Sequence, residues 1–340
     1  ISTAIVTKLQ DEYPDASIYF ATQPQYFDII KDHPAVHGVV EYHPELLNYR
    51  TPEHFGPSPG FVDMCLCPFI ITQKIPHWIH SGHGESLGVS YAHMCNLTMT
   101  DEEIEEEMLI NIDESINIPE NKYITFHRQT TQDPKDYERW EEVLPNIKDL
   151  TIVQVGAKDE PLVEHDNIID MRGKTTPQQL AHLIVNAELH LGLDSFPSHV
   201  ARAVGTKSVV LYGGTYAKQG GIQNGISLEP GNRGRCVTSC HLEKCILKEK
   251  QIGDKCINNI MPEEVLEILK EQLGEKHIVP PKPLKLSAYC IIKDGDKYHF
   301  PYEKCINAAC NIVDEFIMVD GGSTDGTWEN LQKLVEKNAK

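Results

Sequence analysis

The residues best suited to chemistry stand near the middle of the chain, where a strand expected over 189–193 leads into Gly192-Leu193-Asp194-Ser195. A helix pattern of small residues follows over 200–205. A strand that turns into a helix in this way presents backbone N–H groups and a hydroxyl to a phosphate. The Asp194 carboxylate and the His199 imidazole would lie on the same rim, so the pattern predicts a phosphate-binding site.

The same four residues have a plainer interpretation. Asp and Ser are common N-cap residues, and a Gly-x-Asp-Ser turn is also what an ordinary capped helix start looks like. Taken alone, the turn favours the cap. Only the motifs around it favour the binding site.

Composition limits the classes of protein to consider. The chain has 340 residues, 40% of them hydrophobic, which suggests about two globular domains. Its formal net charge is −19, and residues 1–118 carry −14 of it, with four Lys or Arg against eighteen Asp or Glu. Such a surface repels phosphate backbones, so nucleic acid is not an expected partner.

No apolar run approaches the roughly 18 residues of a membrane helix, and no signal peptide opens the chain. We therefore expect a cytoplasmic protein without a transmembrane segment. The chain starts at Ile1 rather than Met, which is typical of a processed, trimmed or fragmentary sequence.

Residues 1–118 predict a parallel sheet with helices on its faces. Helices are expected over 2–13 and 25–31, and strands over 16–21 and 36–42. This alternation is typical of α/β proteins. A first strand and its loop would then precede Ile1.

Residues 119–275 predict a complete nucleotide-binding α/β domain, again by alternation of strands and helices. Strands are expected over 123–126, 150–156, 167–171, 189–193 and 208–212, and helices over 135–144, 177–186, 200–204 and 262–273. The first of these strands delivers His127 and Arg128 at its end.

A stiff, proline-rich linker is expected over 276–284. Beyond it, residues 285–340 predict two strands and two helices, ending in Asp320-Gly321-Gly322-Ser323 and the segment that follows. A piece of about 55 residues is small for a free-standing domain and indicates the opening of a larger one.

The stretch 170–215 resembles glycosyltransferase family 9, the ADP-heptose:lipopolysaccharide heptosyltransferases. The resemblance rests on Arg172 to Thr176, on Gly192 to Ser195 with His199, and on Gly205-Thr206 with Leu211 to Thr215. A tail with Cys236, Cys240, Cys245 and Cys256, and the opening Tyr13-Pro14-Asp15, also resemble family members.

This resemblance implies a GT-B architecture, in which two Rossmann-like domains face each other across a cleft. Residues 1–118 would bind the acceptor and residues 119–275 the nucleotide sugar, with no metal required for catalysis. The general base of the family would lie before Ile1. The implied donor-binding residues are Gly192, Asp194, Ser195, His199, Arg128, Lys174, Thr175, Gly213, Gly214 and Thr215.

Residues 285–340 resemble a second family, the family 2 glycosyltransferases of GT-A fold, through Val319 to Thr327. The resemblance implies that Asp320 and Asp325 would contact a nucleotide. A divalent metal would be needed only if the GT-A domain were completed, because the metal motif and the catalytic carboxylate of that family come later in its sequence.

The four cysteines Cys236, Cys240, Cys245 and Cys256 have two interpretations. Thiolates could hold a structural zinc or iron ion. Their spacing, however, lacks the two-residue gaps of common metal knuckles, and this favours reduced packing thiols. In both interpretations we expect the four sulfurs in one local cluster.

Two functions from different classes remain. The first is an active glycosyltransferase (EC 2.4) that moves a sugar from an ADP-heptose-like donor to a glycan or protein acceptor. The second is a nucleotide-sugar-binding, catalytically incomplete scaffold module of a larger multi-domain glycosyltransferase. A nucleotide-sugar epimerase of GT-B type is weaker, because no sequence motif places the catalytic carboxylates that it would need.

Overall fold

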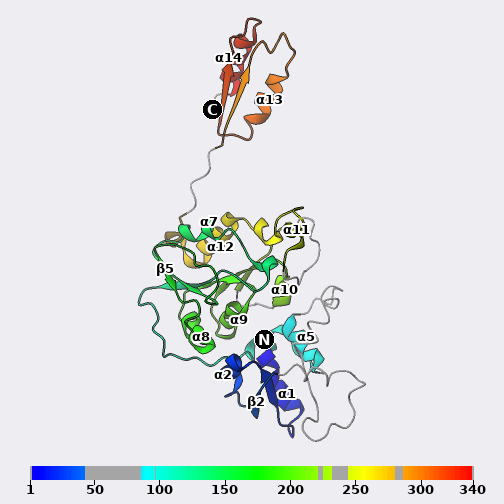
Figure 1. Ribbon diagram of the computed structural model, residues 1–340, viewed down its shortest axis with the longest axis vertical. Helices are drawn as coiled ribbons and strands as arrows, with labels where there is room; N and C mark the ends of the chain where they lie inside the picture. Colours follow the sequence, from blue (N-terminus) through cyan, green and yellow to red (C-terminus); the bar gives the residue numbers. More distant parts are fainter. Residues whose placement is uncertain are drawn as a thin grey trace. The chain divides into compact units, whose positions relative to one another are not determined.

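The computed structural model describes residues 2–42, 86–95, 97–220, 225–231, 244–279 and 286–338 (Figure 1). The chain divides into two compact units, Ile1–Pro280 and Pro281–Lys340. Within the described residues, none of the helices combines the length and the apolar character that crossing a membrane requires. The division at Pro281 falls inside the segment expected as a linker, while the further division of the first unit stays a prediction.

A six-stranded parallel sheet forms the centre of the first unit, in the order β5-β4-β3-β6-β7-β8. Its strands are β3 (Tyr123–His127), β4 (Thr151–Val155), β5 (Ile168–Asp170), β6 (His190–Leu193), β7 (Ser208–Leu211) and β8 (Gly225–Leu228). The parallel α/β fold expected from the sequence is confirmed. The strand β8 is an addition, since the sequence pattern gave no sign of it.

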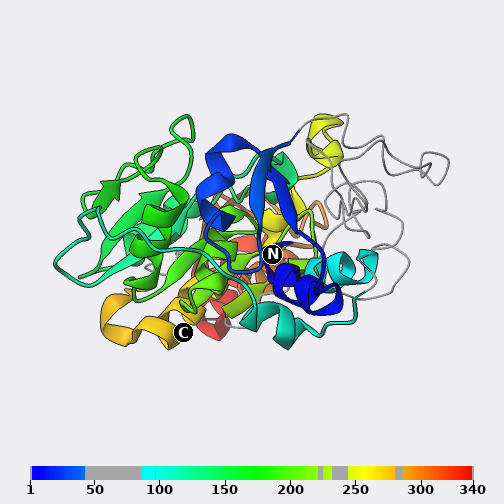
Figure 2. The ribbon, with the colours of Figure 1, turned by 90° about the horizontal axis from the view of Figure 1, so that it is seen from below.

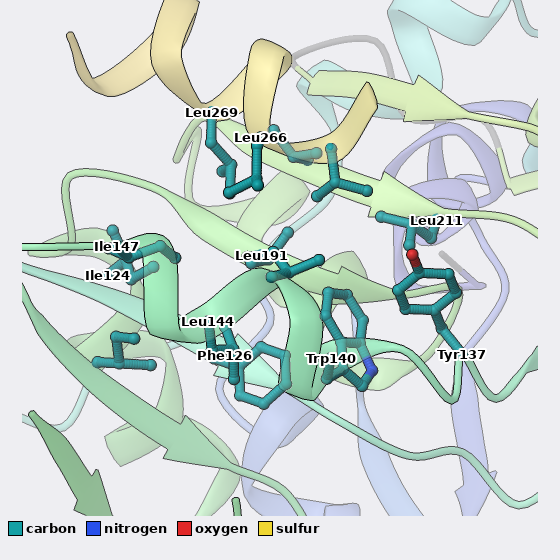
Figure 3. Close-up of a cluster of buried hydrophobic side chains, with 14 of the residues drawn as sticks. Ile124, Phe126, Tyr137, Trp140, Leu144, Ile147, Leu191, Leu211, Leu266 and Leu269 are labelled. Carbon is teal, nitrogen blue, oxygen red and sulfur yellow. The ribbon is translucent and has the colours of Figure 1, made fainter. Parts of the chain in front are cut away.

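Both faces of this sheet are covered, which is why β3, β6 and β7 are buried along their whole length. One face packs on α7 (Trp140–Val143) and α12 (Pro262–Leu273). The other face packs on α8 (Pro177–Val185) and α9 (Phe196–Ala203). Figure 3 draws the first cluster, in which the rings of Phe126 and Trp140 meet edge to face with centroids 4.9 Å apart.

The helices begin where the sequence provides caps. Thr176 and Gln179 form a capping box at the start of α8, with Pro177 in its first turn. Pro197 stands in the first turn of α9. That helix therefore starts at Phe196, four residues before the position expected from the small-residue pattern.

The helix expected over 135–144 is present only in its second half. A 3₁₀ turn, η5 (Asp133–Lys135), is followed by extended chain, and α7 begins only at Trp140. Asp136 accepts a hydrogen bond from the Thr130 N–H at 2.7 Å, and the buried Tyr137 donates its hydroxyl to the Ile260 carbonyl at 2.9 Å. These long-range contacts stabilise a conformation that helical spacing alone does not predict.

Short elements complete this part of the chain. They are η6 (Leu144–Asn146), α10 (Ala217–Gly220), α11 (Ile246–Glu249), η7 (Cys256–Asn259) and η8 (Glu275–His277).

The N-terminal part contributes a separate two-stranded parallel sheet, as expected. Its elements are η1 (Ser2–Ile5), α1 (Val6–Glu12), β1 (Tyr19–Thr22), η2 (Pro24–Tyr26), α2 (Phe27–Ile30), β2 (Gly38–Glu41), α5 (Leu87–Met94) and α6 (Asp101–Glu106). Figures 1 and 2 place the blue strands on the α8 and α9 side of the large sheet. The acidic run at 101–107 is a capped helix with one buried residue, Ile104.

The second unit is a small βαβα arrangement. The strands β9 (Ser287–Ile292) and β10 (Glu315–Asp320) pair in parallel over six residues. The helices α13 (Tyr302–Ala309) and α14 (Thr327–Asn338) contribute Tyr302, Ile306, Leu331 and Leu334 to its own small core.

Candidate functional site

Asp194 follows β6 directly and is the centre of a buried polar cluster at the carboxyl edge of the large sheet. Its Oδ2 accepts from the Lys135 ammonium at 2.7 Å and from the Thr215 hydroxyl at 2.6 Å. The His199 Nε2 lies 3.7 Å from Oδ1. Because parallel strands end at the same edge, the turns after β6 and β7 bring Asp194 and Thr215 together.

Lys135 is the member of this cluster that sequence patterns did not reveal. Its turn, η5, is fixed on one side by Asp133, which accepts from the Cys245 N–H at 2.9 Å and lies 2.5 Å from the buried Lys255 ammonium. On the other side, Gly213 approaches so closely that a Cβ there would lie 2.6 Å from the Pro134 carbonyl oxygen. A glycine at 213 is the sequence signal for this approach.

The electrostatics of the cluster keep the carboxylate ionised. Burial by itself would raise the pKa of Asp194, but Lys135, His199 and the Thr215 hydroxyl outweigh burial and lower it. Burial lowers the pKa of His199 to about 4, against the opposing pull of Asp194. At neutral pH the cluster is therefore a buried Lys–Asp ion pair beside a neutral imidazole.

Ser195 is the N-cap residue of α9, yet its side chain makes no capping hydrogen bond. Its Oγ instead lies 2.8 Å from Nδ1 of His127, at the end of β3. The Nε2 of that ring lies 3.3 Å from Glu160 Oε1. The simple cap interpretation therefore does not describe this hydroxyl.

A second histidine supports the strand behind the site. His190 is fully buried, with Nδ1 3.0 Å from the Thr125 hydroxyl and Nε2 3.2 Å from the Ser198 hydroxyl. Because Ser198 donates its proton to the Leu193 carbonyl at 2.6 Å, Nε2 must carry the proton of the neutral ring. Burial lowers the pKa of His190 to about 3.

The other predicted donor-binding residues divide into two groups. Gly192, Gly213 and Gly214 lie beside the Asp194 cluster, on β6 and just after β7. A Cβ at Gly192 would lie 3.2 Å from the His127 Cβ, so this glycine lets β3 and β6 approach at the site.

In the described part of the chain, Arg128, Lys174 and Thr175 have no hydrogen bond or ion pair with Lys135, Asp194, His199 or Thr215. The Arg128 guanidinium pairs with Glu141 at 2.7 Å, and the exposed Lys174 ammonium donates to the Asp170 carbonyl at 2.6 Å. Lys174 and Thr175 follow β5, which β4 and β3 separate from β6. At about 4.8 Å per strand this is about 14 Å.

The structure describes only two of the four cysteines that were expected to cluster. Cys236 and Cys240 lie outside the described residues, while Cys245 and Cys256 are buried. Among the described residues, no group of three His, Cys, Asp or Glu side chains is arranged to hold a metal ion. The clustering of the four sulfurs stays a prediction.

In the second unit, Asp320 accepts from the Ser323 N–H at 2.9 Å and from the Gly322 N–H at 3.1 Å. Asp325 accepts from the Lys297 N–H at 2.6 Å and the Thr327 N–H at 3.1 Å. Both carboxylates order the turn after β10, and their predicted contact with a nucleotide is untested.

Residues 95–244 match the model of glycosyltransferase family 9 (heptosyltransferase). This stretch of the chain is similar to a family 9 domain. The match covers somewhat less than half of the chain and includes Lys135, Asp194, Ser195 and Thr215. The class of protein expected from the sequence, that of the glycosyltransferases, is thereby supported. The trailing family 2 resemblance stays a prediction.

A curated relative, lipopolysaccharide heptosyltransferase 1 of Campylobacter coli, is 25% identical over 125 residues. That alignment spans 37% of this chain and about a third (32%) of the relative.

Two solved structures of TibC share the fold. The complex of this dodecameric, iron-containing heptosyltransferase with ADP-D-beta-D-heptose has a TM-score of 0.55 and 13% identity, covering 80% of this chain and 73% of TibC. The structure of TibC from enterotoxigenic E. coli H10407 has a TM-score of 0.53 and 14% identity, covering 81% and 74%. The α/β fold is therefore similar to that of a heptosyltransferase.

Proposed function

We propose that this chain transfers a sugar from a nucleoside diphosphate sugar, with an ADP-heptose-like donor, to a glycan or protein acceptor without a catalytic metal. The observation that carries the proposal is the buried Lys135–Asp194 pair beside the N-terminus of α9. The family 9 match over the same residues supports it, and so does the ADP-D-beta-D-heptose bound by TibC.

The chemistry requires stabilisation of a diphosphate as it leaves the sugar. Lys135 supplies a positive charge, and the first turn of α9 adds the positive end of a helix dipole. The Ser195 hydroxyl stands at the same turn and donates to a phosphate oxygen. Asp194 holds the Lys135 ammonium in place and is available through Oδ1 to a hydroxyl of the donor.

The proposal assigns donor binding to residues 119–275 and acceptor binding to residues 1–118. Within the first range it relies on Asp194, Ser195, His199 and Thr215, with glycines 192, 213 and 214 around them. Arg128, Lys174 and Thr175 stay predictions whose contacts would have to change on ligand binding. Residues 285–340 are proposed as the start of a GT-A domain, through Asp320 and Asp325.

Calorimetric titration of the whole chain with ADP-, GDP- and UDP-sugars tests the donor site. Asp194→Ala should weaken binding at least tenfold, because it removes the acceptor that holds Lys135. The matched control is Asp166→Ala, a change at an exposed residue before β5. Equal binding by wild type and Asp194→Ala would remove this site from the proposal. Binding without sugar transfer to any acceptor would favour the scaffold alternative.

The acceptor is proposed to be neutral or cationic. The acceptor-side residues 1–118 carry −14, and this charge opposes the approach of a phosphorylated glycolipid, most strongly at low salt. An acceptor screen at two salt concentrations tests the idea. Efficient transfer to a phosphorylated core glycolipid, with a rate that falls as salt rises, would show it to be wrong.

A further inference from the structure

Glu160, His127 and Ser195 form a continuous hydrogen-bonded row along the carboxyl edge of the sheet. Glu160 follows β4, His127 ends β3 and Ser195 follows β6. These three strands are neighbours in that order. The His127 ring is buried, with a side-chain exposure of 4%, and it contacts Glu160 at 3.3 Å and Ser195 at 2.8 Å. The row runs directly into the proposed diphosphate site.

The carboxylate end of the row is held firmly. The Ala157 N–H donates to Glu160 Oε1 at 2.7 Å, and the Arg172 guanidinium donates to the Glu160 carbonyl. Gly156 has φ +140, and the Glu160 carboxylate occupies the space that a side chain there would need. This carboxylate therefore keeps its orientation toward the imidazole.

The partners fix which nitrogen of neutral His127 carries the proton. An ionised carboxylate only accepts hydrogen bonds, so Nε2 must donate to Glu160. Nδ1 is then an acceptor, and it receives the single proton of the Ser195 hydroxyl. In this state Ser195 offers lone pairs, but no proton, to anything bound in front of α9.

A diphosphate has the opposite requirement, because its oxygens only accept hydrogen bonds. When the Ser195 proton turns to the diphosphate, Nδ1 of His127 loses its donor and faces the lone pairs of Oγ. A second proton on the ring makes Nδ1 a donor to Oγ and restores this hydrogen bond. Glu160 faces that ring and stabilises the added charge. His190 contributes no charge of its own, since burial keeps it neutral at ordinary pH.

We propose that His127 is a positioning residue that takes up a proton when the diphosphate binds, which turns the Ser195 hydroxyl from a donor to the ring into a donor to the phosphate. The inference rests on the proposed function and adds to it a coupling between donor binding and pH. No covalent bond is made or broken: one proton from solvent moves to Nδ1, and the serine hydroxyl rotates.

Proton uptake is measured directly by titrating the whole chain with a nucleoside diphosphate sugar in buffers of different ionisation enthalpy. ADP-glucose is a suitable probe, because its diphosphate has no ionisation near neutral pH. Between pH 7 and 8 we expect wild type to take up as much as about one proton per ligand. The affinity should then fall by up to about tenfold for each unit by which the pH rises.

His127→Asn keeps a polar group near the position of Nδ1 but cannot become cationic, so binding should persist with no proton uptake. Ser195→Ala should also bind without uptake. Glu160→Gln removes the charge that stabilises the cationic ring and should move the uptake to lower pH. A merely structural role for His127 would change the affinity and leave the proton count as it is.

Two other histidines provide matched controls. His182→Asn alters a half-buried residue on α8, outside the row, and should keep both affinity and uptake. His199→Asn changes the other histidine of the site and should keep the uptake whatever its affinity. Uptake that vanishes in His199→Asn, or that survives in His127→Asn, would overturn the inference and leave the proposed function standing. Absence of binding by ADP-, GDP- and UDP-sugars alike would overturn both.

Discussion

The Lys135 ammonium lies 2.7 Å from Asp194 Oδ2, although the two residues are 59 positions apart in the chain. Both side chains are largely buried, with exposures of 16% and 9%. A buried pair of this kind is costly to desolvate and strongly destabilising to break. Its position at the end of β6, beside the first turn of α9, indicates a functional reason for keeping it.

Lys135→Met should weaken the binding of a nucleoside diphosphate sugar by roughly 10- to 100-fold, since a charge-assisted hydrogen bond contributes about 1.5–3 kcal/mol. Calorimetry on the whole chain measures the effect. Lys148→Met is the control, because Lys148 is exposed and precedes β4, at the opposite edge of the sheet. Similar losses of affinity in both variants would mean that the positive charge of Lys135 does not contribute specifically to donor binding.

Stability should fall as the pH drops from about 6.5 toward 4. The pKa of His190 is lowered from 6.5 to about 3 in the folded chain, so over this range the unfolded chain binds a proton that the folded chain does not. This imbalance lowers the free energy of unfolding by up to about 1.4 kcal/mol per pH unit. His199, with its pKa lowered to about 4, acts in the same direction.

Urea unfolding at pH 7, 6 and 5 tests this pH dependence. His190→Gln should be less stable than wild type at pH 7 and should lose less stability on acidification. His182→Asn should keep the full pH dependence. An unchanged slope in His190→Gln would show that the acid sensitivity comes from other groups.

Gly213→Ala should disturb the turn that carries Lys135. The added Cβ would lie 2.6 Å from both the Pro134 carbonyl oxygen and the Ile257 Cβ, so the backbone must move. We expect a loss of about 1–3 kcal/mol in the free energy of unfolding together with weaker donor binding. Gly231→Ala, where no atom lies within 4 Å of the new Cβ, should stay within about 0.5 kcal/mol of wild type. Equal stability of the two variants would contradict the close approach of Gly213 to the Pro134 carbonyl oxygen.

Arg202 of α9 connects the part of the first unit that holds the large sheet to its N-terminal part. Its Nε donates to Glu105 of α6 at 3.0 Å, with side-chain exposures of 1% and 12%. Arg202→Met should lower the free energy of unfolding by about 3 kcal/mol, because it leaves a mostly buried carboxylate without its partner. Thermal unfolding of Arg202→Met, of Glu105→Gln and of the double variant measures the coupling. Additive losses would show that the two side chains do not interact in solution.

The local features of this chain could be predicted from the sequence because each depends on neighbouring residues. Runs such as Thr151–Val155 are apolar enough to indicate buried strands, and Thr176 followed by Pro177 predicts the start of α8. The Gly-x-Asp-Ser turn after β6 marks the candidate site for the same reason: strand, turn and helix are adjacent in the chain.

Only the tertiary structure decided which side chains meet at that turn. The order of the strands places β3 between β4 and β6, and this order brings His127 and Glu160 to Ser195. Helical spacing predicted a helix starting at Lys135. Instead, Lys135 lies in a 3₁₀ turn, which the burial of Tyr137 and the ion pair between Lys135 and Asp194 stabilise. Contacts between residues far apart in the chain depend on the free energy of the whole packed sheet, which no local pattern contains.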